Sequence, residues 1–421
     1  MKVIADLQIH SRYSRACSQD LIPGNIAFWA DKKGIQVIGT GDLTHPKWIA
    51  ELKESLVEAE PGLYKMKDGK TKARFMLTAE VSSIYKQGEK VRRVHNMILA
   101  PNFAAADKII TGLEKLGANL KSDGRPIMGV HCDALVKVVR EADENAVIIP
   151  AHVWTPHFGL FGSLSGFNSV EEAFGDQSKY IFAIETGLSS DPAMNWQISE
   201  NDKYTLLSNS DAHSLRKIGR EANVFEIDPK KLSYAEIIRI IKVKNPKEFL
   251  YTIEFFPEEG KYHLDGHADC KFSCLPEQTK KLKGICPVCG KKLLVGVLSR
   301  VSELADRKPG ESPKKPIPFK SVIPLEEVIA DTYEVGPGSK KVLTMYEQMV
   351  SKYPEFEILL ELPEEEIEKI SDKNIATSVM RVRTGNVHVE GGYDGIFGKI
   401  HIYSDKERAK FLKKPIQKDL F

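Results

Sequence analysis

The chain has 421 residues, of which 42% are hydrophobic and 28% charged, and its 60 Lys and Arg against 58 Asp and Glu give a net charge of +2. This length suffices for two or three domains. The near-neutral balance excludes nucleic-acid binding through the field of the whole molecule, so such binding would need local basic surface. No apolar run reaches the length of a membrane-spanning helix, and the first residues lack the apolar segment of a secretory signal. We therefore expect a cytoplasmic protein with no membrane partner.

Short β-branched runs alternate with longer amphipathic segments over about the first 245 residues. Strands are expected at residues 2–8, 35–40, 74–80, 95–100, 146–152, 180–185 and 204–210. Helical patterns lie between most of them, for example at residues 23–34, 46–60 and 104–117. This alternation predicts an α/β fold with a parallel sheet or barrel, and the number of strands favours a closed or nearly closed barrel.

The pattern changes after residue 250. Short pieces punctuated by Gly and Cys continue to about residue 308, and a Pro- and Lys-rich stretch then has the composition of a linker. Mainly helical patterns follow, and residues 386–403 read as a hairpin. We predict a first domain at residues 1–248, a small module at 249–312, a mainly helical domain at 313–410 and a tail at 411–421.

Side chains that can bind metal ions follow the expected strands of the first domain. Asp6, Gln8 and His10 alternate along the first strand and therefore point the same way. Because the C-terminal ends of barrel strands converge on one mouth, residues far apart in the sequence are expected to meet there. The other candidates at strand ends are Asp42, Glu80, His95, His152, Glu185, Asp211 and His213.

Mixed imidazole and carboxylate ligands suit Zn²⁺, Mn²⁺ or Fe, and carboxylate-rich parts suit Mg²⁺. Two or three closely spaced ions would lower the pKa of a bridging water towards about 7 and clamp a phosphate in the transition state. Any one of these residues is equally well explained as a capping Asp or a satisfied core His. Their conjunction predicts a metal-dependent phosphoesterase, with catalytic roles for Asp6, His10, Asp42, Glu80, His152, Asp211 and His213.

Four of the six cysteines lie within twenty residues of one another. Two thiolate pairs, the second in a CPVCG turn, have the spacing of a closed tetrahedral structural zinc site. We expect His263 and His267, just upstream, to be surface or packing residues. The predicted zinc ligands are Cys270, Cys274, Cys286 and Cys289.

The strand-end residues resemble the motifs of the PHP (polymerase and histidinol phosphatase) phosphoesterases. Asp211-Ala212-His213 matches a closing motif of that family, and Thr40-Gly41-Asp42 resembles another. The resemblance implies a distorted (β/α)₇ barrel with three metals, in which Glu80 bridges ions and His95 and His152 are ligands. Gln8 stands where the family has His, and Cys17 is either a further ligand or a buried structural residue.

Segments over essentially the full length resemble the endonuclease Q family. These are GTGDLTHPKW, the Cys-containing block from Tyr262 to Arg307, GPGSKK and EGGYDGIFGKI. The resemblance implies a DNA repair enzyme that uses Mg²⁺ or Mn²⁺ to cleave DNA 5′ of deaminated bases (uracil, hypoxanthine, xanthine) and of abasic sites. A monomer would suffice for this chemistry. The alternatives are a small-molecule phosphatase of the histidinol-phosphatase kind and a DNA-binding accessory protein with little catalytic activity.

An enzyme that inspects a base in a duplex extrudes it into a pocket with stacking surfaces. The aromatic, Gly-rich segment after His152 offers such surfaces, although packing of a lid onto the barrel explains it equally well. Two arginines after His213 are candidates for phosphate contact or for ordinary helix surface. The predicted DNA-contacting residues are Trp154, Phe158, Phe161, Phe167, Arg216 and Arg220.

The C-terminal tail resembles a shortened sliding-clamp-binding peptide. Gln417 and the apolar end Leu420-Phe421 carry this resemblance. Because short peptides of this sort arise often by chance, clamp binding and no binding are equally good readings.

Overall fold

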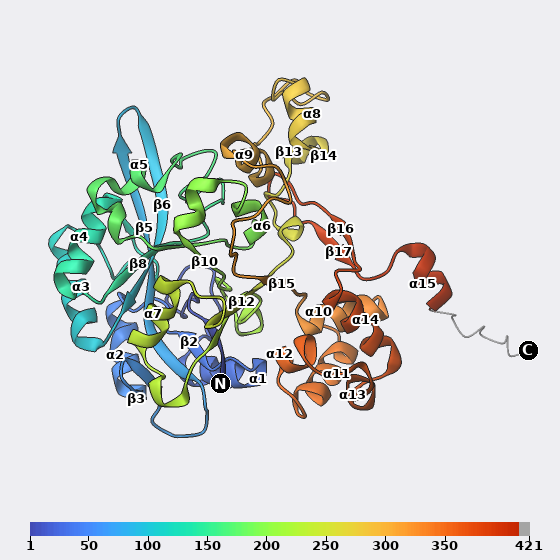
Figure 1. The fold of residues 1–421 in the computed structure, drawn as a ribbon, viewed down its shortest axis with the longest axis horizontal. Helices are drawn as coiled ribbons and strands as arrows, with labels where there is room; N and C mark the ends of the chain where they lie inside the picture. Colours follow the sequence, from blue (N-terminus) through green and yellow to red (C-terminus); the bar gives the residue numbers. More distant parts are fainter. Residues whose placement is uncertain (412–421) are drawn as a thin grey trace, which may run out of the picture.

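The computed structural model describes residues 1–411 and shows a mixed α/β body with a central sheet (Figure 1). The predicted α/β class is confirmed. The strands of the body are β1 (Lys2–Asp6), β2 (Val37–Gly39), β3 (Leu56–Glu60), β4 (Leu63–Met66), β5 (Arg74–Gln87), β6 (Lys90–Ala100), β7 (Ile127–Met128), β8 (Val147–Pro150), β9 (Ala183–Glu185), β10 (Thr205–Leu207), β11 (Ala222–Glu226), β12 (Phe249–Glu254) and β15 (Phe319–Ser321).

Helices cover the outside of this sheet, as the blue to green ribbons of Figure 1 show. Their apolar faces pack on the buried faces of the strands, and polar faces meet solvent. They are α1 (Pro23–Lys33), α2 (Pro46–Ser55), α3 (Phe103–Lys115), α4 (Cys132–Ala142), α5 (Val170–Phe174), α6 (Pro192–Asn195) and α7 (Tyr234–Val243).

The pairing within the sheet is mixed and not uniformly parallel. β1 and β2 pair in parallel, as do β2 and β5, whereas β6 runs antiparallel to both β5 and β8. The cause is local: Gly88, with φ of +60°, turns β5 directly into β6, and antiparallel strands need only such a short connection. β9 and β10 form a separate parallel pair.

The sheet also takes in strands from beyond the predicted first domain. β12 pairs with β11, and β15 pairs in parallel with β12. The predicted boundary between residues 248 and 249 therefore falls inside the sheet, because β12 has the same buried pattern as the strands before it.

A small module stands out from the body (Figure 1). Its core is little more than Cys274, Cys286 and Leu293, so it has few apolar contacts of its own. We call it the zinc module, after the metal predicted from the sequence of its cysteines. It consists of β13 (Asp265–His267), β14 (Phe272–Cys274) and α8 (Pro276–Lys281), and α9 (Val297–Leu304) follows it.

The C-terminal helices pack around a core of their own beside the sheet. The hairpin expected at residues 386–403 is present as an antiparallel pair of strands. None of the helices in the described part of the chain is long and apolar enough to cross a membrane. The elements are α10 (Leu325–Tyr333), α11 (Lys340–Val350), α12 (Glu355–Leu360), α13 (Glu364–Ile370), α14 (Lys373–Arg383), β16 (His388–Glu390), β17 (Lys399–His401) and α15 (Asp405–Phe411).

Candidate active site

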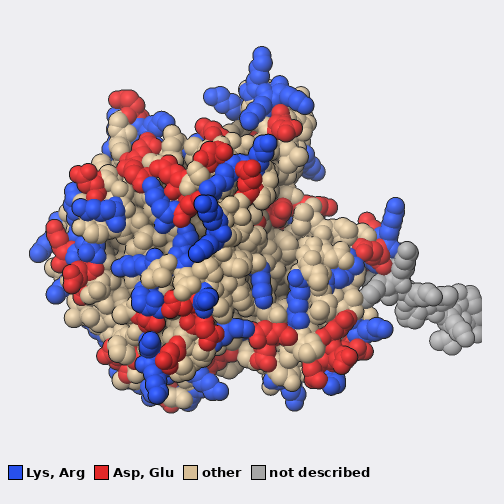
Figure 2. Space-filling view, viewed as in Figure 1, with Lys and Arg blue, Asp and Glu red and all other residues tan. Residues whose placement is uncertain are grey.

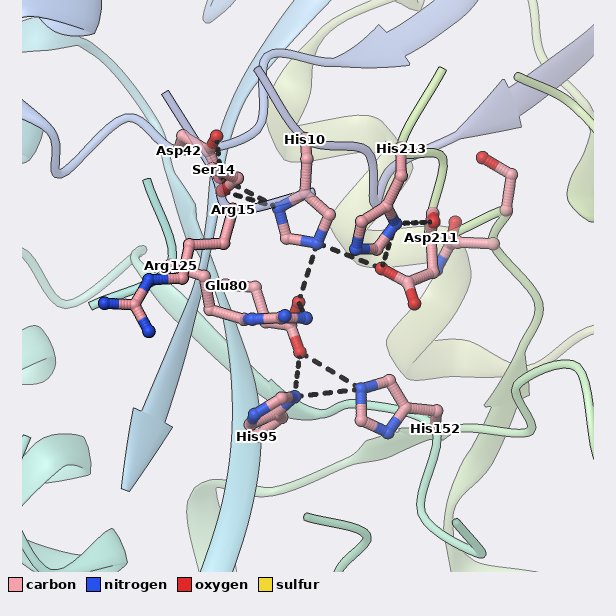
Figure 3. Close-up of polar contacts among 12 residues, drawn as sticks. His10, Ser14, Arg15, Asp42, Glu80, His95, Arg125, His152, Asp211 and His213 are labelled. Carbon is pink, nitrogen blue, oxygen red and sulfur yellow. Dashed lines mark hydrogen bonds and ion pairs between the residues drawn. The ribbon is translucent and has the colours of Figure 1, made fainter. Parts of the chain in front are cut away.

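Many of the predicted ligands meet at one end of the central sheet (Figure 3). His10 follows β1, His152 follows β8, and Asp211 follows β10. Glu80 and His95 lie within β5 and β6, since these two strands run past the site as a long hairpin and do not end at it. The sheet thus gathers side chains that are up to two hundred positions apart.

Three side chains form what we call the His10 group: His10, Asp211 and His213. The Nε2 atom of His10 lies 3.0 Å from Asp211 Oδ1 and 3.0 Å from Glu80 Oε2. The Nδ1 atom of His213 lies 2.8 Å from the Asp211 carbonyl oxygen, which orients that ring. Two imidazoles and a carboxylate therefore converge on one point.

A second set, the Glu80 group, comprises Glu80, His95 and His152. Glu80 Oε1 lies 2.5 Å from His95 Nδ1 and 3.0 Å from His152 Nε2, and these two nitrogens are 3.1 Å apart. Burial lowers the pKa of His95 to about 4, so its nitrogen lone pair is free to bind a cation. Because each Glu80 oxygen faces a different group, Glu80 connects the two.

The donor set of these groups fits divalent cations. Imidazole nitrogens and carboxylate oxygens of this kind bind Zn²⁺ and Mn²⁺, and the carboxylates also suit Mg²⁺. The backbone is strained at the site: Asp42, His152 and Asp211 have φ of 49°, 30° and 46°. Such conformations cost about 1–3 kcal/mol each and occur where surrounding structure enforces them.

Asp42 contacts His10 and does not join either group. Its Oδ1 lies 3.0 Å from His10 Nδ1, while Oδ2 accepts from the Ser11 and Ser14 hydroxyls at 2.6 and 2.9 Å. Burial alone would raise the pKa of Asp42, but the charge and hydrogen bond of His10 outweigh it and lower that pKa. The predicted ligand Asp42 is thus placed to fix the ring of His10.

Three other predicted ligands, Asp6, Gln8 and Glu185, also lie outside both groups. Asp6 accepts from the backbone N–H groups of Ser210 and Gly219 at 3.0 and 2.9 Å, and burial raises its pKa to about 6. Glu185 and Gln8 face each other. Their positions at strand ends are as expected, but backbone and amide donors occupy their oxygens.

Arg125, which the sequence analysis did not single out, reaches the site from the loop before β7. Its Nη1 lies 3.2 Å from Glu80 Oε2. A side chain on Gly124 would collide with Asp42 and Ser14, so only glycine lets this loop approach these two residues so closely. Burial favours the neutral acid at Glu80, but His95 and Arg125 hold its pKa well below its usual range.

A cavity of about 570 Å³ opens beside the two groups, and we call it the metal cavity. That volume is typical of a small-molecule or nucleotide site. Two of the predicted DNA-contacting residues, Phe158 and Arg220, line it. Its other lining includes His95, His152, Asp211, His213, Lys217, Phe255, Lys261, Tyr262 and Phe397.

The remaining predicted DNA contacts lie outside the lining of this cavity. Trp154, Phe161 and Phe167 are buried in the main core, and Trp154 donates to Asn195 Oδ1 at 2.7 Å. The Arg300 guanidinium donates to the carbonyl oxygens of Phe161 and Phe167, which fixes this loop against the core. Arg216 lies outside the cavity lining and pairs with Glu326 at 3.0 Å.

In the zinc module, the side chains close enough together to hold an ion are His267, Cys270, Cys286 and Cys289, and Cys274 of the predicted four lies outside this cluster. Cys274 Sγ instead lies 3.2 Å from Thr279 Oγ1. The β13–β14 register explains the exchange, because it places Cys274 opposite Asp265, two residues along the strand from His267. His267, expected to be a surface or packing residue, thus lies among the candidate ligands.

The predicted clamp-binding residues Gln417, Leu420 and Phe421 lie outside the described residues.

Comparison with known proteins gives matches to all or part of the chain. A family model described as the MJ0043 C-terminal domain matches residues 324–386. Uncharacterized protein MJ0043 of Methanocaldococcus jannaschii is 34% identical to this chain over 256 residues. These residues are 60% of this chain and 32% of MJ0043, so the chain spans about a third of the length of that relative.

Two solved structures match nearly end to end. One is the lesion-specific endonuclease PfuEndoQ from Pyrococcus furiosus, with a TM-score of 0.84 and 30% identity over 98% of this chain and 100% of that chain. The other is endonuclease Q in complex with a 27-mer duplex that has an abasic lesion at the active site, with a TM-score of 0.85 and 30% identity over 97% and 98% of the two chains. At this identity and coverage, the chain belongs to the endonuclease Q family of DNA endonucleases.

Proposed function

We propose that this protein, a metal-dependent DNA endonuclease, hydrolyses the phosphodiester bond 5′ of abasic sites and of deaminated bases (uracil, hypoxanthine and xanthine). The observation that carries the proposal is the position of Glu80, which connects two ligand groups beside a cavity of nucleotide size. The neighbour bound to an abasic duplex supports DNA as the substrate.

The ligand groups are the proposed metal sites. The His10 group and the Glu80 group would each hold a divalent ion, Zn²⁺, Mg²⁺ or Mn²⁺, and bound ions supply Lewis acidity towards phosphate oxygens and a nucleophile at neutral pH. Asp42 holds His10 in orientation, and Arg125 places a fixed positive charge beside Glu80. Asp6, Gln8 and Glu185 support the surrounding backbone.

Basic surface on both sides of the metal cavity is the proposed path of the DNA. A second cavity of about 740 Å³ shares His157 with the first, and Lys90 and Arg93 are among the residues that line it. Lys and Arg side chains also gather on the protruding tip of the zinc module (Figure 2). Phosphate contacts of this kind position a duplex without reading its sequence.

The proposal also includes a barrel arrangement of the strands, a zinc ion in the small module and a binding role for the C-terminal tail. The order β1, β2, β5, β6 and β8, followed by the β9–β10 pair, is compatible with a distorted (β/α)₇ barrel, and the bridge between Ile9 and Ala212 ties its two ends. The zinc module would hold one structural Zn²⁺, and the tail, residues 411–421, would bind a sliding clamp.

An incision assay tests the proposed function. Labelled duplexes with an abasic site, uracil, hypoxanthine, xanthine or no lesion are incubated with the protein and Mg²⁺ or Mn²⁺. We expect a nick 5′ of each lesion, with 3′-hydroxyl and 5′-phosphate ends, and an intact control duplex. Phosphate release from small esters without nicking would favour a small-molecule phosphatase, and tight lesion binding without nicking would favour an accessory protein.

A further inference from the structure

An exposed aromatic side chain lies at the edge of the metal cavity. Phe397 is 70% exposed although it lines the cavity together with Phe255 and Tyr262. Burial of a Phe ring is normally favourable, so a ring left in water beside a binding cavity points to a partner surface.

The loop that carries Phe397 is fixed by its backbone. Gly392 donates to the Glu258 carbonyl oxygen at 2.7 Å, and Gly398 donates to that of Glu259 at 3.0 Å. A side chain on Gly398 would collide with the Glu258 carbonyl oxygen. The exposure of Phe397 is thus built into a tightly packed turn between β16 and β17.

Positive charge accompanies the ring. Lys261 Nζ lies 5.6 Å from the Phe397 ring centre and 5.4 Å from that of Tyr262, and Lys261 has no ion pair to a carboxylate among the described residues. An aromatic ring next to an unpaired cation is the pair of groups that binds a base together with its phosphate.

We propose that Phe397 enters the base stack of the duplex, in the space left by the damaged nucleotide when that nucleotide moves into the metal cavity, while Lys261 contacts an adjacent phosphate. This inference rests on the proposed function. Extruding a nucleotide from the duplex loses the free energy of its stacking and base pairing, and an inserted apolar side chain restores part of the stacking. Phe158, by contrast, stacks against His95 with ring centres 4.5 Å apart and belongs to the cavity wall.

The requirement for Phe397 should therefore depend on whether the lesion is stacked in a duplex. Its contribution should disappear for a lesion in single-stranded DNA or in an unpaired bubble, where there is no stack to open. A merely structural role would affect every substrate alike.

Single-turnover incision of an abasic-site analogue tests this with Phe397→Ala, Phe397→Trp and the control Phe28→Ala. Phe28 is a suitable control because it is 55% exposed on α1, with Lys32 Nζ 5.3 Å from its ring. We expect Phe397→Ala to slow duplex incision roughly 10- to 100-fold, to change bubble incision less than about 3-fold, and Phe397→Trp to restore the duplex rate. Equal losses on both substrates, or no loss on the duplex, would overturn the proposal.

A binding measurement separates this inference from the proposed function. With 2-aminopurine beside the lesion, Glu80→Gln protein should increase fluorescence on binding, and Glu80→Gln combined with Phe397→Ala should not. If the wild-type protein cuts no DNA, the proposed function fails, whereas an equal fluorescence increase with both variants overturns only the role of Phe397.

Discussion

With its amide in the orientation that satisfies its hydrogen bonds, the side-chain nitrogen of Gln8 faces both carboxylate oxygens of Glu185, at 3.0 and 2.9 Å, in the protein interior. The same carboxylate accepts from His152 N–H and from Asn209 Nδ2, at 2.7 and 2.8 Å. Gln8 and Glu185 therefore hold the backbone of His152 in place, and both Glu185 oxygens already accept hydrogen bonds from neighbouring donors. This relationship explains how an amide is accommodated at a strand end where a metal ligand was predicted.

Gln8→Ala should lower the free energy of unfolding by about 1–3 kcal/mol, because it leaves the buried Glu185 carboxylate short of a donor. The metal content of the site should stay unchanged, since Gln8 is outside both ligand groups. Urea unfolding and elemental analysis measure the two quantities. Gln348→Ala, at an exposed amide, is the control. Reduced metal content with unchanged stability would instead show Gln8 to be a ligand.

Arg125→Ala should reduce the single-turnover incision rate by about 100-fold, because a preorganised positive charge beside developing phosphate charge is lost. Arg125→Lys should recover part of that rate. Rate constants and DNA affinity measured in parallel would check this. Arg15→Ala is the matched control, since Arg15 is largely exposed and pairs with Asp123 at 3.4 Å. Full activity of Arg125→Ala would exclude a role for this guanidinium.

His267→Ala should remove the proposed structural zinc from the zinc module, whereas the Cys274→Ser variant should keep it. The reason is that His267 lies in the cluster of candidate ligands and Cys274 does not. Zinc per chain, measured by elemental analysis, should fall by one ion in the first variant alone. Since the module has almost no apolar core, loss of the ion should also make it sensitive to protease. Zinc loss in Cys274→Ser would restore the four-cysteine prediction.

Two buried carboxyl groups, Glu221 and Glu254, should make the protein less stable as pH rises. Burial and their mutual repulsion raise the pKa of Glu221 well above its usual range, and burial raises that of Glu254 to about 8. Between the unfolded value near 4.5 and about 8, the folded state binds more protons, so the free energy of unfolding falls as pH rises through this window.

Glu254→Gln should flatten this pH dependence and raise stability at pH 8 by about 1–3 kcal/mol. Urea unfolding between pH 5 and 8.5 checks the prediction, with Glu89→Gln as control because Glu89 is 99% exposed. A variant whose stability falls with pH as steeply as the wild type would contradict the assignment.

The sequence could predict those site residues whose positions depend only on local strand patterns. His10, His152 and Asp211 follow β-branched strands, so their convergence was predictable from strand periodicity and strand ends alone. Glu80 and His95 were identified as ligands, but the sequence did not show that β5 and β6 continue past them as a hairpin.

The residues that sequence reasoning missed depend on contacts between distant segments. Arg125 reaches Glu80 only because Gly124 packs against Asp42 and Ser14, and no local pattern encodes that approach. His267 lies in the cluster of candidate ligands and Cys274 does not, because of the register of β13 and β14. For the aromatic segment after His152, base stacking and packing of a lid were equally good explanations from the sequence. Only the structure shows that Arg300, well over a hundred residues away, donates to this segment and fixes it against the core.

The most direct test of the account is single-turnover incision of an abasic duplex by Glu80→Gln, with DNA affinity measured in parallel and Glu89→Gln as control. Glu80 connects the two ligand groups, and an amide cannot supply two anionic oxygens to them. We predict a loss of at least about 1000-fold in rate, little change in DNA affinity, and a fully active control. Incision by Glu80→Gln at a rate close to that of the wild type would contradict the proposed site.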